Sequence, residues 1–120
     1  MSEKSILICD DDEGIVDVAS IILTDAGYKV FAITESQKVM LNAKKINPQL
    51  ILLDLWMPNL SGEEVTKQLK QTPETSNIPI IIVSASRNTE DIAKRIGADY
   101  FLCKPFDMEE LETVVKKYTD

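Results

Sequence analysis

The 120 residues predict one α/β domain, in which a doubly wound parallel sheet of five strands is covered by helices on both faces. Five short apolar runs alternate with stretches of helical periodicity, and no repeat, linker or low-complexity segment interrupts them. The runs at residues 50–53 and 80–83 are apolar at every position, which is typical of strands buried on both faces. Strands that alternate with helices imply right-handed crossovers, so we expect the sheet order 2-1-3-4-5.

The composition is that of an ordinary globular domain, and it excludes several functions. Hydrophobic residues make up 44% of the chain and charged residues 28%. The formal net charge of −7 argues against direct nucleic-acid binding, which requires a basic surface. No apolar run is long enough to cross a membrane and no signal peptide is present, so we expect a cytoplasmic location. Because the chain has no histidine, Ser-His-Asp and Cys-His catalysis within it are excluded.

The first half of the chain predicts three strands and two helices. The strands are residues 5–9, 29–33 and 50–53. After the first strand, apolar residues recur at helical spacing and predict the buried face of a helix that ends at Gly27. These residues are Ile15, Val18, Ala19, Ile22 and Ala26. A weaker helical pattern covers residues 36–45.

The second half predicts two more strands and three helices. The strands are residues 80–83 and 100–103, and helices begin after Ser61, around Thr89 and after Asp107. Ser61 and Asp107 are each followed three residues later by a glutamate, which is the spacing of a capping box at the start of a helix. We expect Thr89 to cap the helix between them. In the last helix the inward side chains should be Met108, Leu111, Val114, Val115 and Tyr118.

The two cysteines, Cys9 and Cys103, each end an apolar run. We expect both to be small buried hydrophobic side chains, because a cytosolic chain rarely holds a disulfide. Two isolated cysteines without a histidine also exclude a typical zinc site.

Polar side chains follow the predicted strands at the point where each strand ends. Three aspartates, Asp10 to Asp12, follow the first strand, and Asp54, Ser84 and Lys104 follow the third, fourth and fifth strands. Because the carboxyl ends of parallel strands meet at one edge of the sheet, these side chains should converge there. Carboxylates that converge require a cation, and a ligand set of oxygens alone suits Mg²⁺ or Mn²⁺.

A lysine and a hydroxyl beside such an ion would supply hydrogen-bond donors for a phosphoryl group. The sequence therefore predicts a Mg²⁺-dependent phosphoryl-acceptor site, with Asp54 as the nucleophile that forms an aspartyl phosphate. Each residue has a simpler interpretation when taken alone. Asp12 or Glu13 can cap the first helix, and Lys104 can be a surface lysine before a turn.

Four segments resemble the signatures of the receiver domain of two-component response regulators. They are ICDDDEGI (8–15), LLDLWMPNLSG (52–62), IIVSAS (81–86) and GADYFLCKPF (97–106), and the resemblance covers residues 1–120 as a single receiver domain. It implies a flavodoxin-like fold and phosphorylation of Asp54 from a phosphohistidine of a partner. It also implies that Asp11 binds Mg²⁺ directly and Asp10 binds it through water, beside Asp54 and the backbone carbonyl of Trp56. Three consecutive aspartates leave this assignment uncertain by one residue.

The resemblance also assigns a switch. Lys104 would pair with the phosphoryl group, before a cis bond to Pro105. Ser84 and Phe101 would form the switch pair, in which the hydroxyl moves toward the phosphoryl group and the ring turns inward. Phe101 has no hydroxyl, unlike the tyrosine common in the family, so ring packing alone must distinguish the two states. Trp56 and Ser86 would flank the phosphoryl group and set its lifetime.

The partners implied are a sensor histidine kinase or a histidine phosphotransfer protein, and a downstream effector protein or domain. The output surface would be the fourth helix, the fifth strand and the fifth helix, which could also form a phosphorylation-dependent homodimer. The domain would catalyse its own phosphorylation and dephosphorylation, although it is better described as a signalling switch than as an enzyme. The alternative is a receiver-like protein-interaction module that works without phosphorylation. An aspartate-nucleophile phosphatase is disfavoured, because position 56 holds Trp where that chemistry requires a second carboxylate.

Overall fold

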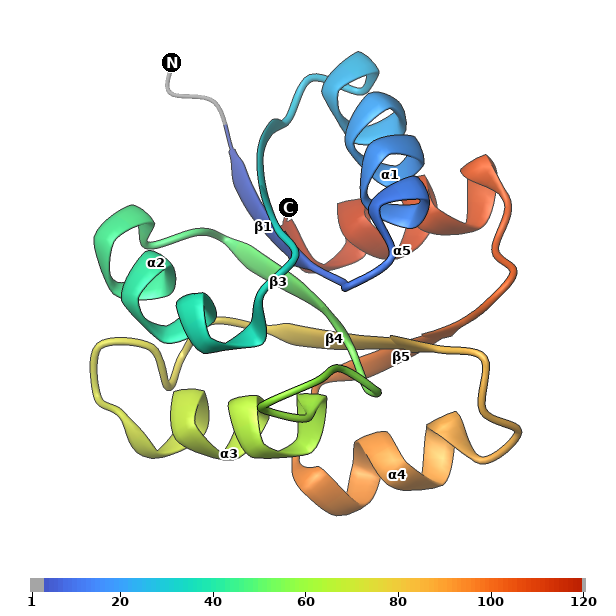
Figure 1. Ribbon diagram of the computed structural model, residues 1–120. Helices are drawn as coiled ribbons and strands as arrows, with labels where there is room; N and C mark the ends of the chain where they lie inside the picture. The colour runs from blue at the N-terminus through green and yellow to red at the C-terminus, as the bar shows by residue number, and fades with distance from the viewer. Residues whose placement is uncertain (1–3, 120) are drawn as a thin grey trace.

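The computed structural model describes residues 4–119, which form one parallel sheet between two layers of helices (Figure 1). The strands are β1 (Ser5–Cys9), β2 (Lys29–Ile33), β3 (Leu50–Asp54), β4 (Ile80–Ser84) and β5 (Tyr100–Cys103). They lie in the order β2-β1-β3-β4-β5, and every neighbouring pair is parallel. The predicted doubly wound sheet is therefore confirmed. Residues 1–3 and 120, the ends of the predicted domain, lie outside the described residues.

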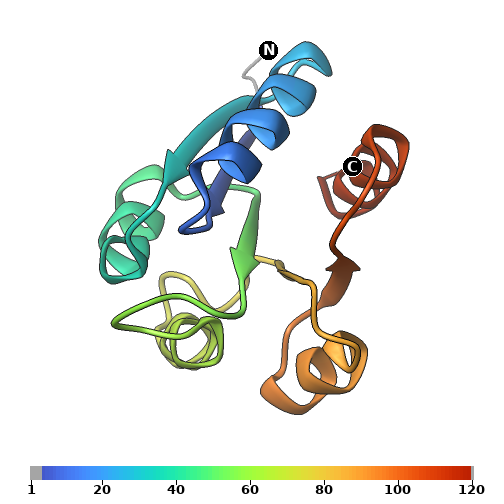
Figure 2. The ribbon, with the colours of Figure 1, turned by 45° about the vertical axis from the view of Figure 1, so that its right-hand side comes forward.

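Helices follow each strand along the chain. They are α1 (Glu13–Asp25), α2 (Val39–Ile46), α3 (Gly62–Gln71), α4 (Thr89–Ile96) and α5 (Met108–Thr119), and the 3₁₀ turn η1 (Ser36–Lys38) precedes α2. Figure 2 shows α1 and α5 on one side of the sheet and α2, α3 and α4 on the other. Among the helices of residues 4–119, none is long and apolar enough to cross a membrane.

The sheet separates two apolar clusters, because successive residues of a strand point to opposite faces. In β3, Leu50 and Leu52 pack on the side of α1 and α5. Ile51 and Leu53 pack on the other side, with residues of α2, α3 and α4. β3 is thus buried on both faces along its length, and Asp54 is the residue at which it reaches the edge of the sheet.

The helix starts follow the predicted capping residues, with one exception. The side chain of Asp12 accepts hydrogen bonds from the backbone N–H groups of Gly14 and Ile15 at the start of α1. Ser61 and Asp107 each accept one from the N–H group three residues later. The prediction for Thr89 is wrong, because Thr89 is the first residue of α4 and its hydroxyl donates to the carbonyl of Ser86 at 2.6 Å.

The predicted buried faces of α1 and α5 are partly wrong. In α1 the buried residues are Val16, Ala19 and Leu23, whereas Val18 is exposed and Ala26 lies beyond the end of the helix and is exposed too. In α5, Met108 is exposed, whereas Leu111 and Val115 are buried as predicted. The reason is that α1 carries apolar residues on two overlapping faces, so that one helical period fits both faces equally well.

The two cysteines differ in their environment. Cys9 is buried, as predicted, whereas Cys103 is exposed, so the prediction for Cys103 is wrong. β5 is one of the two edge strands of the sheet, and its last residue, unlike Leu102 before it, is exposed. Both cysteines are free thiols.

Candidate functional site

The strand ends bring the predicted site residues together at one edge of the sheet. Cys9 of β1 lies opposite Leu53 of β3, so Asp10 and Asp54 follow side by side on neighbouring strands. Ser84 lies opposite Cys103, which places Lys104 one residue beyond the end of β5. The backbone N–H of Lys104 donates to the carbonyl of Ser84 at 2.9 Å and extends this pairing by one residue.

Lys104 connects the two central carboxylates. Its Nζ lies 2.7 Å from Oδ2 of Asp10 and 3.2 Å from Oδ1 of Asp54, so that one ammonium group bridges the ends of β1 and β3. Burial alone lowers the pKa of Lys104, but the hydrogen bonds and charges of Asp10 and Asp54 outweigh it, and the net shift of the pKa is upward. Lys104 is therefore held as a cation inside the site.

Asp10, Asp11 and Asp54 form an acidic cluster. One carboxylate oxygen from each residue lies within 4.8 Å of the others. Asp12 is not part of this cluster, because its carboxylate caps α1. The geometry thus favours the first two of the three consecutive aspartates, which is the assignment that the resemblance implies.

The carboxyl group of Asp54 lies in an environment that opposes its ionisation. Asp54 is only 6% exposed, and Ile8, Leu52 and Phe106 line the space beside it. Burial and the neighbouring charge of Asp10 raise the pKa of Asp54 to about 6, although Lys104 lowers it in part. A divalent cation among these oxygens would offset the repulsion, so the donor set fits a hard ion such as Mg²⁺.

The loop after β3 joins Asp54, a member of this cluster, to α3. Gly62 donates its N–H to the carbonyl of Leu55 at 2.8 Å, which closes the loop at its base. A Cβ atom on Gly62 would lie 2.4 Å from the backbone oxygen of Asp54, so that a larger residue there would displace the end of β3. Trp56, the only tryptophan of the chain, lies on this loop and its side chain is 65% exposed.

Ser84 and Phe101 lie on the same face of the sheet, on neighbouring strands. Ser84 is fully buried, and its Oγ accepts a hydrogen bond from the N–H of Ser86 at 3.1 Å. Phe101 lies opposite Ile82, and both side chains belong to the cluster on the side of α3 and α4. Phe101 itself is partly buried, so its ring has access both to that cluster and to the surface.

One contact to the loop was not predicted from the sequence. The hydroxyl of Ser36, which lies between β2 and α2, forms hydrogen bonds with the backbone at Pro58 and Leu60. Ser36 has no motif around it that would indicate a site residue. The Lys104–Pro105 peptide bond is cis, in agreement with the resemblance.

The family model for the response regulator receiver domain matches residues 6–116. The chain belongs to the response regulator receiver family. The match covers β2 to β5, all of β1 except Ser5, and the acidic cluster at the carboxyl ends of the strands.

Two curated relatives differ in how much of their length matches this receiver domain. The chain is 39% identical over 108 residues to the DNA-binding dual master transcriptional regulator RpaA of Synechocystis, and this covers 88% of the chain and 45% of RpaA. It is 34% identical over 120 residues to sporulation initiation phosphotransferase F of Bacillus subtilis, with 98% of the chain and 95% of that protein covered. The receiver domain thus spans less than half of the first relative and nearly all of the second.

Solved structures agree with the fold. A response regulator from Chloroflexus aurantiacus superimposes with a TM-score of 0.93 at 26% identity, and 98% of each chain is covered. The receiver domain of the sensor histidine kinase PA1611 from Pseudomonas aeruginosa has a TM-score of 0.90 at 22% identity, again with 98% of each chain covered. That second structure contains a magnesium ion in its active-site cleft.

Proposed function

We propose that this receiver domain accepts a phosphoryl group on Asp54 from the phosphohistidine of a sensor histidine kinase or a histidine phosphotransfer protein. The observation that carries the proposal is the position of the Asp54 carboxylate. It lies 3.2 Å from the ammonium group of Lys104 and within 4.8 Å of carboxylate oxygens of Asp10 and Asp11, at the open edge of the sheet. Phosphoryl transfer requires positive charge around the nucleophile, and Lys104 supplies one cation here. A divalent ion among the three carboxylates would supply the rest.

In the transfer step, a carboxylate oxygen of Asp54 attacks the phosphorus atom. A P–O bond forms to Asp54 while the P–N bond to the donor imidazole breaks, and the imidazole nitrogen retains the electron pair and takes up a proton. Lys104 stays near its present position and pairs with a phosphoryl oxygen, because it already contacts Asp54. The buried hydroxyl of Ser84 donates to another phosphoryl oxygen.

Asp10, Asp11, Asp54 and the backbone carbonyl of Trp56 would hold Mg²⁺, or Mn²⁺ in its place. The ion supplies positive charge that offsets the charge of the three carboxylates and of the incoming phosphoryl group. The magnesium ion in the cleft of the Pseudomonas receiver domain supports this assignment.

The output is a change of state of Ser84 and Phe101. Phosphorylation draws the Ser84 hydroxyl toward the phosphoryl group, and the ring of Phe101 turns into the space beside Ile82. Two states separated by a few kcal/mol suffice, provided that phosphorylation stabilises one of them preferentially. If a ring hydroxyl stabilises the inward conformation, Phe101→Tyr should increase the dependence of partner binding on phosphorylation. Unchanged phosphorylation-dependent binding would exclude a contribution of the hydroxyl.

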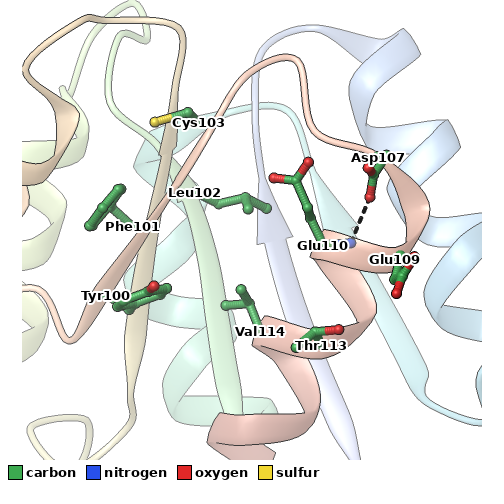
Figure 3. A pocket seen from close by; sticks show the side chains of 9 residues that line it. All are labelled: Tyr100, Phe101, Leu102, Cys103, Asp107, Glu109, Glu110, Thr113 and Val114. Atoms are coloured by element: carbon green, nitrogen blue, oxygen red, sulfur yellow. Dashed lines mark hydrogen bonds between the residues drawn. The ribbon is translucent and has the colours of Figure 1, made fainter.

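The α4, β5 and α5 surface is the output face of this proposal. A groove of about 470 Å³ runs between β5 and α5, with Tyr100 and Phe101 on one side and Val114 on the other (Figure 3). Asp107, Glu109 and Glu110 lie along the α5 side of the groove. An effector protein or domain with apolar side chains beside basic ones complements this surface, and a second copy of the domain could use the same face in a phosphorylation-dependent dimer.

The domain works in the cytoplasm in this proposal, where both kinds of phosphodonor present their histidines. Signalling then passes by protein contact from donor to receiver to effector, and the receiver itself does not bind nucleic acid. The net charge of −7 supports this exclusion.

The deciding experiment is intact mass spectrometry after incubation with acetyl phosphate. We expect one added phosphoryl group in the presence of Mg²⁺, and no addition with a chelator or in Asp54→Asn. An adduct that persists in Asp54→Asn would refute the assignment of Asp54. If no adduct forms in the wild type, a beryllofluoride titration followed by Trp56 fluorescence decides between a short-lived adduct, which still binds this phosphoryl mimic, and an interaction module that works without phosphorylation.

A further inference from the structure

The hydroxyl of Ser36 contacts the loop that follows β3 from a different crossover of the sheet. Ser36 begins the turn η1 and is only 3% exposed. Its Oγ donates a hydrogen bond to the carbonyl of Pro58 at 3.0 Å and accepts one from the N–H of Leu60 at 3.2 Å. A single buried hydroxyl thus bridges the carbonyl and the N–H group on either side of Asn59.

The turn that Ser36 bridges is an unusual one. Asn59 has a φ of +72°, and the N–H of Leu60 also donates to the carbonyl of Pro58 at 3.0 Å. A hydrogen bond that encloses one residue at positive φ defines a γ-turn of the rare, strained form. Strained backbone persists only where the surrounding structure holds it, and Ser36 is the side chain that does so here.

The rest of the loop is fixed at its two ends. At one end Asp54 is paired with Val83 in the sheet. At the other end Gly62 packs against the backbone of Asp54 and Leu55 so closely that it leaves no space for a side chain. Between these points, Ser36 holds the chain at Pro58 and Leu60. Trp56 is therefore two residues away from each of two constraints, the end of β3 and the Ser36 bridge.

We infer that Ser36 is a positioning residue of the phosphoryl-acceptor site. Ser36 holds the γ-turn at Asn59 and so fixes the direction in which the chain leaves Trp56. This direction sets the orientation of the Trp56 backbone carbonyl, which we propose as the ligand that completes the oxygen set of the acidic cluster. This inference rests on the proposed function. Ser36 itself touches neither the metal ligands nor the phosphoryl group, and it acts only through the loop.

The expected consequence is a change in metal affinity. Mg²⁺ requires nearly ideal octahedral geometry, so a displaced carbonyl ligand weakens binding even when the carboxylates are unchanged. Loss of an outer partner that orients a metal ligand lowers affinity by roughly tenfold or more. Because Ser36 contacts the loop at Pro58, two residues beyond the proposed ligand Trp56, we expect Ser36→Ala to weaken Mg²⁺ binding by roughly three- to tenfold.

The test is a Mg²⁺ titration of the whole chain, followed by the fluorescence of Trp56. The affinity is taken from the midpoint of the titration, which does not depend on the amplitude of the signal. Ser36→Thr keeps the hydroxyl and should restore an affinity within about twofold of the wild type, since the hydrogen bonds and not the side-chain volume carry the effect.

Thr75→Val is the matched control. Thr75 is fully buried and its hydroxyl donates to the carbonyls of Leu69 and Thr72, at 2.7 and 3.3 Å, but it lies before β4 at the opposite edge of the sheet. Thr75→Val therefore removes a comparable buried hydroxyl far from the site. We expect it to lower the free energy of unfolding as Ser36→Ala does and to leave the Mg²⁺ midpoint unchanged.

Equal midpoints for the wild type, Ser36→Ala and Thr75→Val would overturn the inference, and so would a weakened midpoint in both variants. If Ser36→Ala does not fold, Ser36→Cys replaces it, because a thiol fills similar space and forms only weak hydrogen bonds. A wild-type midpoint in Ser36→Cys would then refute the role of the hydroxyl. Failure of the wild type itself to bind Mg²⁺ would refute the proposed function, which distinguishes the two results.

Discussion

The carboxyl group of Asp54 titrates differently in the folded and the unfolded chain. Its pKa is raised to about 6 by burial and by the charge of Asp10, against 3.8 for a free side chain. The folded state therefore binds the Asp54 proton more tightly than the unfolded state does. Well below pH 4 both states are protonated and the group costs nothing, whereas the folded state loses stability as the pH rises from about 3 through 6.

From this we expect Asp54→Asn to be more stable than the wild type at pH 7 in a buffer with EDTA, by on the order of 2 kcal/mol. The difference should be small near pH 4 and vanish about one pH unit lower. Urea unfolding at the two pH values measures it, and Asp17→Asn, an exposed acid on α1, serves as the control. A variant that is less stable than the wild type at pH 7 would contradict the direction of the shift.

The two thiols should react differently in the native protein. Burial, together with the charges of Asp10, Asp54 and Asp11, raises the pKa of Cys9 to about 12, whereas Cys103 is exposed. Because the thiolate is the reactive form, an aromatic disulfide reagent should label only Cys103 rapidly. Cys103→Ser should abolish this rapid labelling, and a fast phase that remained in the variant would show that Cys9 is accessible.

At the residue scale the sequence allowed the acidic cluster to be predicted but not Ser36. Asp10, Asp54 and Lys104 each follow an apolar run directly, and parallel strands bring such positions to one edge. Ser36 acts only through its hydrogen bonds to the loop after β3. These bonds form only when the connection between β2 and α2 packs against the connection between β3 and α3. Local pattern contains no information about such a contact, since Ser36 and Pro58 meet only in the folded chain.

Among the helices, the stability of α5 depends on the residues at its start. Asp107 accepts a hydrogen bond from the N–H of Glu110 at 2.7 Å, which satisfies one of the free donors at the helix start. We expect Asp107→Ala to lower the free energy of unfolding by about 1 kcal/mol with an unchanged urea m-value. The control is Glu109→Ala, at an exposed position in the first turn of the same helix, which should lower the free energy of unfolding by less. An equal loss of stability in both variants would mean that negative charge near the helix start, and not the capping hydrogen bond, carries the effect.

The positions of the helices and strands follow from the sequence more closely than the helix faces that are buried. Two of the helices end at a glycine that gives a local reason for the end, α1 before Gly27 at a φ of +100° and α4 before Gly97 at a φ of +84°. The choice between two overlapping apolar faces of α1 is made instead by packing against β1, β2 and α5. For that reason the helical spacing alone predicts Val18 to be buried, whereas the structure exposes it.

At the scale of the whole molecule, one sheet is shared by two apolar clusters. Leu52 belongs to the cluster with α1 and α5, while its neighbours Ile51 and Leu53 belong to the other. The two layers should therefore unfold together, because neither keeps its core when β3 is lost. Both clusters follow from the alternation of strands and helices, which is why the fold could be predicted at this scale.

We expect Leu52→Ala to cost about 2–5 kcal/mol, and far-UV circular dichroism and Trp56 fluorescence to report the same unfolding midpoint. Leu41→Ala on α2 is the control, because Leu41 is 70% exposed and its truncation should change stability by less than about 0.5 kcal/mol. Separate midpoints for the two probes would show that the layers on either side of the sheet unfold independently.

The bridge that Lys104 forms between Asp10 and Asp54 has a consequence for how a signal leaves this site. Three ionised carboxylates and the ammonium group of Lys104 together give this edge of the sheet two net negative charges. A divalent ion would neutralise that charge. An acyl phosphate on Asp54, as proposed, would then add only about one negative charge, and salt at physiological strength screens a charge within about 8 Å. The electric field at a distant partner would thus be nearly the same before and after the proposed transfer. We therefore expect the signal to pass as a displacement of atoms along β4 and β5.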